Sequence, residues 1–219
     1  MSRPDDYRTL AEPGEGLHKA KGSKHYGYAY PIAGEEEAAT FVKTLRAEHH
    51  KARHWCYAYR LGDDGTRWRA NDDGEPSNSA GKPILGQIDA LGLTDVLVVV
   101  VRYFGGTKLG VGGLIQAYRE AAAQALADAQ VVTRTRLRRL TVATEYAHLA
   151  DLMTAVKASP FDIEAQRLDT AVELTLAIPA TQFESAHRAL WCALAGVYPG
   201  EEQLDAMPAG YSLRVVDAR

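Results

Sequence analysis

The sequence has few cysteines, no long apolar run and no large excess of charge, and each of these absences excludes a class of protein. Its two cysteines, Cys56 and Cys192, lie far apart, so they supply neither the disulfide framework of a small secreted domain nor a paired metal-ligand motif. The longest apolar run, residues 96–101, is far shorter than the ~20 residues that span a bilayer, and residues 1–16 contain no apolar core of a signal peptide. The net charge of -3 excludes a strongly basic protein. We therefore expect a cytoplasmic protein with reduced thiols and no membrane partner.

The composition is that of a soluble globular chain, with 46% apolar and 24% charged residues. At roughly 150 residues per domain, its length permits one large domain or two small ones. The hydrophobic pattern changes after Thr133, and so does the charge: residues 1–136 hold 18 basic and 17 acidic residues, whereas residues 137–219 hold 7 and 11. The first residues are rich in proline and glycine, which is typical of a mobile segment. We therefore predict a flexible leader at residues 1–18, one domain at residues 19–134 and a second domain at residues 135–219.

The first domain is expected to mix strands and helices. Its most distinctive element is the continuous β-branched run at residues 95–104, DVLVVVVRYF, which is typical of a strand buried on both faces in the middle of a sheet. The remaining elements follow from the spacing of apolar residues and from turn residues. They are strands at 26–32, 55–61 and 66–70, and helices at 35–49, from Pro83 onward and at 114–129.

The second domain shows the order strand, helix, strand, strand, helix, strand. We expect these elements at residues 138–146, 148–158, 161–168, 172–178, up to 195 after a cap at Thr181, and within 211–216. This order is the ferredoxin-like split pattern. The fold class is therefore predicted to be α+β, with two domains.

A glycine-rich segment at residues 105–113, GGTKLGVGG, follows the buried strand and precedes a helix. Backbone N–H groups and a helix N-terminus at such a place can hold a phosphate, with Lys108 as a counter-charge. The spacing matches neither the P-loop nor the dinucleotide fingerprint, because Val111 and Gly112 stand where a P-loop needs Lys and Ser or Thr. The alternative is a tight strand-to-helix corner that needs positive φ angles and close backbone approach.

An acidic loop at residues 71–81, NDDGEPSNSAG, offers three carboxylates in four residues, at Asp72, Asp73 and Glu75. These oxygens can bind a hard cation, but the set lacks the spacing of a calcium loop, and the same sequence is ordinary turn chemistry.

Lysines and tyrosines gather near the start of the first domain, where Lys19, Lys21 and Lys24 are followed by Tyr26, Tyr28 and Tyr30. Cations beside aromatic rings are typical of a surface that follows a nucleic-acid backbone and stacks on bases. The alternative is a solvated lysine edge beside tyrosines that pack on a helix.

No catalytic constellation is evident. His50 and His54 are four residues apart, but no glutamate stands in the metalloprotease position between them. Cys56 has only His54 as a nearby base, without a group to orient that base. We therefore expect no catalytic residues, no metal site and no cofactor.

Three segments together resemble a known family: HWCYAYRLG, NDDGEPSNSAGKPILGQI and DVLVVVVRYFGGTKLGVGGLIQAY. With the specific elements DDGEP, RYFGG and LGxGGL, residues 19–130 resemble the YigZ/Impact family of translation-associated proteins. The second half more weakly resembles the ferredoxin-like domain, similar to one of translation elongation factor G, that bacterial members carry. The sequence departs from the family pattern at Asn78 and Ser79, where glycine and threonine are usual.

The resemblance implies a first domain similar to the second domain of a small-subunit ribosomal protein. It also implies a regulator that acts near the ribosome or on kinases that control initiation, with no established enzymatic reaction. The family motifs predict which residues of this chain bind a partner, and the lysines beside the tyrosines add Lys21 and Lys24 to that set. The expected nucleic-acid or partner-binding residues are Lys21, Lys24, Asp72, Asp73, Glu75, Arg102, Gly105, Gly106, Lys108, Gly110, Gly112 and Gly113.

Two functions of different classes follow. The leading hypothesis is a non-catalytic translation-associated regulatory protein that binds RNA, the ribosome or a translation-regulating protein through the glycine-rich segment, Arg102, Lys108 and the lysine edge. The rival is a metal-dependent enzyme acting on a phosphorylated small molecule, with the glycine-rich segment holding phosphate and the acidic loop holding a divalent ion. A third interpretation is that both loops serve only folding.

Overall fold

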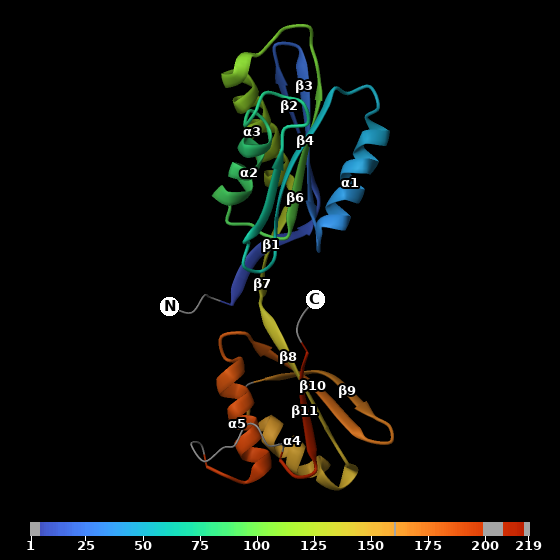
Figure 1. Ribbon diagram of the computed structural model, residues 1–219, viewed down its shortest axis with the longest axis vertical. Helices are drawn as coiled ribbons and strands as arrows, with labels where there is room; N and C mark the ends of the chain where they lie inside the picture. Colours follow the sequence, from blue (N-terminus) through green and yellow to red (C-terminus); the bar gives the residue numbers. More distant parts are fainter. Residues whose placement is uncertain (1–4, 160, 199–207, 217–219) are drawn as a thin grey trace. The chain divides into compact units, whose positions relative to one another are not determined.

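The computed structural model describes residues 5–159, 161–198 and 208–216. The chain divides into two compact units, one of residues 7–134 and one of residues 135–219 together with residues 1–6 (Figure 1). Both units combine sheets and helices, so the predicted α+β class with two domains is confirmed. No helix in the described part of the chain is long and apolar enough to cross a membrane.

The first unit is built on a five-stranded antiparallel sheet in the order β2-β3-β6-β4-β5. Its central strand is β6, Val96–Tyr103, whose first seven residues are buried, as the continuous apolar run predicts. The flanking strands are β2 (Gly14–Ala20), β3 (Ser23–Pro31), β4 (His54–Leu61) and β5 (Arg67–Asn71).

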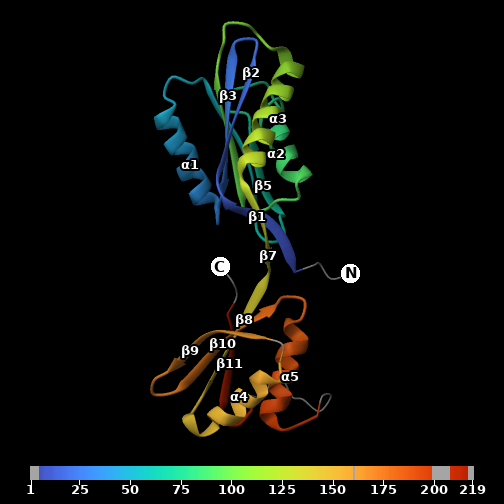
Figure 2. The ribbon, with the colours of Figure 1, turned by 180° about the vertical axis from the view of Figure 1, so that it is seen from behind.

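Helices cover both faces of this sheet (Figures 1 and 2). One face carries α1, Glu35–Glu48, over a core that includes Val42, Leu45 and Val99. The other carries α2 (Gly81–Ala90) and α3 (Gly110–Asp128) over a core that includes Ile84 and Tyr118. Successive residues of a strand point to opposite faces of the sheet. One set of side chains therefore faces α1, and the alternate set faces α2 and α3.

The prediction of a flexible leader is wrong for residues 6–18. They form β1, Asp6–Glu12, which pairs with β7, Gln130–Thr135, and most of β2. The glycines of this segment permit close packing: a Cβ atom on Gly14 would lie 2.3 Å from the Ala129 nitrogen, and one on Gly16 would lie 2.6 Å from the Ala125 nitrogen. Glycine here allows a strand to approach α3 closely, so it does not indicate mobility. Residues 1–4 of the expected leader lie outside the described residues.

The glycine-rich segment is shorter than expected, because α3 begins at Gly110 and not at residue 114. Only residues 104–109 link β6 to α3, and Gly110, Gly112 and Gly113 belong to the first helical turn. Glycine is a poor helix former, so the composition predicts a loop at these three residues where the structure has a helical turn.

The second unit contains a four-stranded antiparallel sheet in the order β11-β8-β10-β9. Its elements follow one another as the ferredoxin-like pattern requires. They are β8 (Leu137–Thr144), η1 (Tyr146–His148), α4 (Leu149–Lys157), β9 (Asp162–Leu168), β10 (Val172–Pro179), α5 (Phe183–Ala195) and β11 (Tyr211–Val216). Buried residues of α4, α5 and alternate strand positions form one core.

Thr181 does not cap α5, contrary to expectation. The residue before the helix is Gln182, which makes no side-chain cap hydrogen bond. The Thr181 hydroxyl instead donates to Asp5.

Candidate functional site

Two turns meet at one end of the five-stranded sheet: the hairpin turn between β2 and β3, and the loop that follows β6. The hairpin turn consists of Lys21 and Gly22, both with positive φ angles of 44° and 81°, as a two-residue type I′ turn requires. A Cβ atom on Gly105 would lie 1.9 Å from the Gly22 carbonyl carbon, and the Gly105 N–H donates to Ser23 Oγ at 3.1 Å. The close approach therefore explains why Gly105 is glycine, and it holds the loop against the hairpin.

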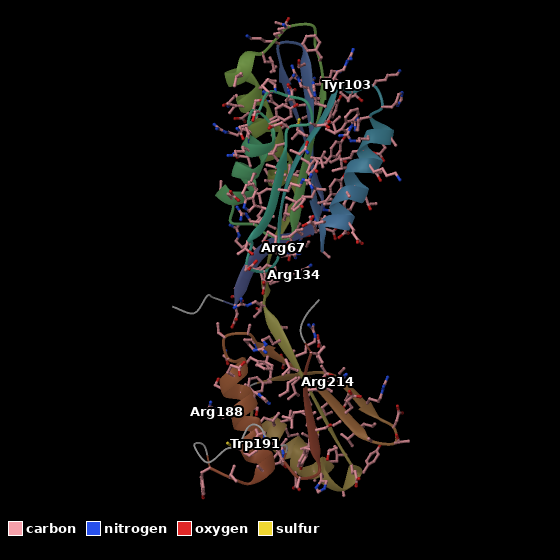
Figure 3. The ribbon with its side chains drawn as sticks, in the orientation of Figure 1. Arg67, Tyr103, Arg134, Arg188, Trp191 and Arg214 are labelled. Carbon is pink, nitrogen blue, oxygen red and sulfur yellow. The ribbon has the colours of Figure 1, made fainter. Side chains whose placement is uncertain are left out.

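A pocket opens beside these turns, on the face of the sheet that α1 covers. It has a volume of about 400 Å³ and is lined by Gly22, Lys24, Tyr26, His49, Tyr103 and Phe104. We call this set the aromatic pocket; Figure 3 shows Tyr103 at this end of the sheet. The Phe104 side chain is half exposed, at 50%. The pocket therefore presents aromatic faces and one cation to solvent.

The walls of the aromatic pocket are held by a hydrogen-bond network around His49, the residue after α1. Its Nε2 lies 2.8 Å from the Tyr28 hydroxyl, and its Nδ1 lies 3.0 Å from the Tyr103 hydroxyl. The Tyr26 ring meets the Tyr103 ring edge-on, with centroids 5.8 Å apart. Burial raises the pKa of Tyr28 to about 12, so its hydroxyl stays protonated. These contacts fix the rings before any ligand binds.

Lys24 lines the aromatic pocket, and three further lysines lie on the strand and turns next to it. Lys24 pairs in register with Lys19 on β2 and with Tyr103 on β6, so these side chains share a sheet face. Lys21 is exposed on the hairpin turn and Lys108 is exposed on the neighbouring loop. The expected binding residues Lys21, Lys24 and Lys108 therefore lie in the two turns and strands that form this end of the sheet.

The N-terminus of α3 follows the same loop. Its first turn contains no acidic residue and no side-chain cap, and Gly110 and Gly112 are exposed. Gly106 and Gly110 have positive φ angles of 88° and 72°, which explains glycine at these two positions. Uncapped N–H groups at the positive end of a helix favour anions nearby.

Glu75 and Arg102 lie inside the unit, although the sequence suggested them as binding residues. Arg102 Nη1 donates to Glu75 Oε1 at 2.5 Å, and the Tyr118 hydroxyl donates to the same oxygen at 2.8 Å. Their side chains are only 7% and 4% exposed. The Arg102 guanidinium carbon also lies 5.7 Å from the centre of the Phe104 ring. The pair therefore supports the aromatic pocket from the interior, and a direct contact with a partner is not available to it.

The two aspartates of the acidic loop are also engaged in structure. Asp72 accepts hydrogen bonds from the backbone N–H groups of Asn78, Ala80 and Gly81, which fixes the loop and the start of α2. Asp73 pairs with Arg46 at 2.5 Å and accepts from the Trp55 N–H at 2.7 Å. The loop thus follows the turn interpretation.

The geometry does not favour the metal-ion hypothesis. The carboxylates of the acidic loop each have other partners, and the described residues contain no cluster of three or more His, Cys, Asp or Glu side chains that could hold a metal ion.

Cys56 is not an activated nucleophile. Burial raises the pKa of its thiol, which donates to the Asp72 carbonyl at 3.0 Å. A protonated, buried thiol is a poor nucleophile.

Sequence reasoning missed a row of polar side chains that crosses the sheet on the face covered by α2 and α3. Strand register places His18 opposite His25, and places Arg102 between His25 and His54. His25 is fully buried, and neither of its ring nitrogens has a hydrogen-bond partner among the described residues. Burial, with a smaller effect of the Arg102 charge, lowers the pKa of His25 to about 4, so the ring is neutral. Only the register of four strands brings these residues together.

Sequence reasoning also missed Tyr103, Phe104 and His49 as walls of the aromatic pocket. An aromatic pair directly before a glycine-rich loop was a usable indication, because an aromatic ring at the end of a buried strand has little core left to enter. The position of His49 depends on the packing of α1, which the sequence does not specify.

Comparisons with known proteins agree on a family. The Impact N-terminal domain matches residues 21–126. IMPACT family member YvyE of Bacillus subtilis is 36% identical over 155 residues, which cover 71% of this chain and 71% of that protein. IMPACT family member YigZ of Escherichia coli is 38% identical over 151 residues, which cover 68% of this chain and 74% of that protein. The crystal structure of a hypothetical protein matches over 99% of both chains, with a TM-score of 0.65 and 30% identity. The chain therefore belongs to the IMPACT family, and its first unit contains the Impact N-terminal domain.

Proposed function

We propose that this protein is a non-catalytic, translation-associated regulatory protein that binds single-stranded RNA at the aromatic pocket. The observation that carries the proposal is the combination of the half-exposed Phe104 ring, backed by two tyrosines, with lysines on two turns that pack together. Proteins that bind single strands without reading their sequence use this combination: rings stack on bases, and cations follow the backbone.

Each part of the site has a role in this proposal. The half-exposed Phe104 ring is the principal stacking surface, and the Tyr26 and Tyr103 rings form the wall behind it. Lys24 in the pocket wall and Lys108 on the loop after β6 neutralise phosphates of the bound strand. The uncapped first turn of α3 adds backbone N–H groups for a further phosphate.

The link to translation is supported by family membership, because members of the YigZ/Impact family look like regulators that act near the ribosome. The RNA would then be ribosomal or ribosome-associated. The buried Glu75–Arg102 pair supports a binding function more than a catalytic one, since its charges are used to hold Phe104 and the loops in place. No observation favours the metal-dependent enzyme.

The test is fluorescence anisotropy of a labelled single-stranded RNA of mixed sequence, titrated at several salt concentrations. We expect binding that weakens with salt, and we expect Lys24→Gln and Lys108→Gln each to reduce the slope of log K against log salt by about 0.7. Lys43→Gln is the matched control, because Lys43 is exposed on α1 and does not line the pocket. Undetectable or salt-independent binding, or equal effects of all three substitutions, would refute the proposal. Capture of a specific protein from lysate that persists after complete RNase digestion and is lost in the Lys24→Gln variant would instead indicate a protein partner.

A further inference from the structure

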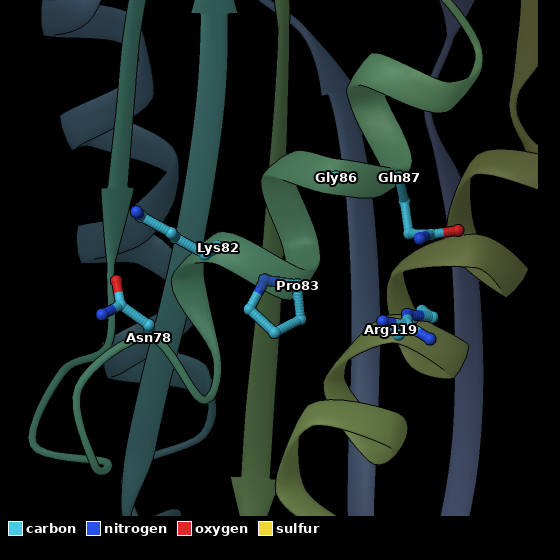
Figure 4. A pocket seen from close by; sticks show the side chains of 6 residues that line it. All are labelled: Asn78, Lys82, Pro83, Gly86, Gln87 and Arg119. Atoms are coloured by element: carbon cyan, nitrogen blue, oxygen red, sulfur yellow. The ribbon is translucent and has the colours of Figure 1, made fainter. Parts of the chain in front are cut away.

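A second cavity lies between α2 and α3. It has a volume of about 530 Å³ and is lined by Asn78, Lys82, Pro83, Gly86, Gln87 and Arg119. Figure 4 shows Lys82 and Asn78 on one side of Pro83, and Gln87 and Arg119 on the other. We call it the α2–α3 pocket. Since α1 and these two helices cover opposite faces of the sheet, the α2–α3 pocket is separate from the aromatic pocket.

The α2–α3 pocket has an unbalanced charge. Lys82 and Arg119 are both exposed, and neither side chain forms an ion pair or hydrogen bond with another residue in the described part of the chain. None of the described residues that line the cavity carries a carboxylate. Two cations that share one concave surface without a counter-charge raise the local concentration of anions.

Gly86 forms part of the cavity wall and has no packing reason to be glycine. It lies in the interior of α2, its φ angle is not positive, and a Cβ atom built on it would meet nothing within 4 Å. Glycine in a helix interior is less stable than alanine by roughly 0.5–1 kcal/mol. No packing contact in the described residues therefore calls for glycine at position 86, and its missing side chain leaves the helix backbone open to a ligand.

We propose that the α2–α3 pocket binds a small hydroxylated phosphate monoester, such as a sugar phosphate. A phosphate monoester carries about -1.5 to -2 charges at pH 7, which matches the two cations. The planar guanidinium of Arg119 suits two phosphate oxygens, and Lys82 supplies a second charge. The side-chain amides of Asn78 and Gln87 offer donors and acceptors for hydroxyl groups. The pocket is wide and open to solvent, so a ligand there would be held chiefly by charge and hydrogen bonds to the side chains that line it.

The experiment is isothermal titration calorimetry of the full chain with ribose 5-phosphate, glucose 6-phosphate and glycerol 3-phosphate. Inorganic phosphate and glucose serve as ligand controls. We expect saturable binding of at least one ester, tighter than either control. We expect Lys82→Gln and Arg119→Gln each to weaken it about tenfold or more, because each removes a charged hydrogen bond. Lys43→Gln on α1 is the charge-matched control and should leave it unchanged.

Gly86→Ala separates a ligand role from a structural one. The substitution should raise the melting temperature, because no atom blocks the new methyl group, and it should weaken ester binding. The proposal is overturned by the absence of saturable binding of all three esters up to about 10 mM, by unchanged binding in the Lys82→Gln/Arg119→Gln double variant, or by inorganic phosphate binding as tightly as the esters. Binding of 5′-phosphorylated RNA at Lys82 and Arg119 in preference to the esters would also contradict it. Because Phe104→Ala should not affect ester binding, failure at this pocket is distinguishable from failure of the RNA proposal.

Discussion

The fully buried His25 makes the first unit sensitive to acid. Its ring nitrogens have no partners among the described residues, and it lies near Arg102, His18 and Glu75, with the Tyr118 ring edge-on at 5.2 Å. In the unfolded chain, the histidine pKa is about 6.5. In the fold it is about 4, chiefly because burial disfavours the charged ring.

The size of the effect follows from linkage. A pKa that is lower in the folded state means that the unfolded chain binds more protons below pH 6.5, so stability falls as the pH falls. At 1.36 kcal/mol per pKa unit, the shift from 6.5 to about 4 amounts to about 3 kcal/mol. This loss is negligible well above pH 6.5, develops as the pH falls from about 6.5 to 4, and levels off below pH 4.

The assay is urea unfolding of the wild type and of His25→Phe at several pH values from 7.5 to 4. Phenylalanine keeps an aromatic ring beside Tyr118 and removes no hydrogen bond, so the informative quantity is the pH dependence and not the absolute stability. We expect the wild type to lose about 3 kcal/mol more than the variant across this range. Parallel stability profiles would refute the reasoning, and so would an NMR titration showing an ordinary pKa for His25.

Three further substitutions test the scaffold beneath the aromatic pocket. Glu75→Gln should lower the free energy of unfolding by about 3–5 kcal/mol, because it leaves the Arg102 charge buried without a counter-charge; a loss below about 1 kcal/mol in urea unfolding would show that water reaches this pair. Asp72→Ala removes the acceptor of three backbone N–H groups and should cost about 2–4 kcal/mol, measured in the same way, with unchanged stability as the contradicting result. Lys21→Asn should raise stability by up to about 1 kcal/mol, because asparagine tolerates the left-handed conformation better, and it should weaken RNA binding. A stabilised variant with full RNA affinity would show that Lys21 does not contact RNA.

Much of the fold was predictable because it depends on local patterns. The run at residues 96–103 is apolar at nearly every position, and only a central strand with both faces covered can bury it. The second unit was recognisable because β10 alternates strictly between buried and half-buried residues and the buried residues of α5 recur at three- and four-residue steps. Strand β9, which is exposed along its whole length, carries no such pattern.

The errors came from glycine, whose meaning depends on distant neighbours. The composition around Gly14 and Gly16 predicts mobility, but α3 packs so closely against both residues that only glycine fits there. The glycine content around Gly110 and Gly112 predicts a loop, but both residues lie in the first turn of α3. The sequence shows that a side chain is absent, and only the tertiary structure shows what occupies its place.

The candidate site was predicted only in part. The lysines of the hairpin turn and the loop were expected to bind a partner, and the structure leaves Lys21, Lys24 and Lys108 exposed. Glu75 and Arg102 were expected in the same role, but strand register and the cover from α3 bury them. Whether a charged residue faces solvent depends on pairings between strands that are far apart in sequence, which local patterns do not specify.

The most direct test of the central claim is an NMR titration of the full chain with a single-stranded hexanucleotide RNA. The account predicts that the largest chemical-shift changes occur at residues 22–26 and 103–106, and that Phe104→Ala weakens binding about 5- to 150-fold, as expected for the loss of one base stack. The indole signal of Trp68 is an internal control, because Trp68 is 53% exposed on β5, at the opposite edge of the sheet from the hairpin turn. Shifts centred on Trp68, or RNA binding that is unchanged in Phe104→Ala, would contradict the account.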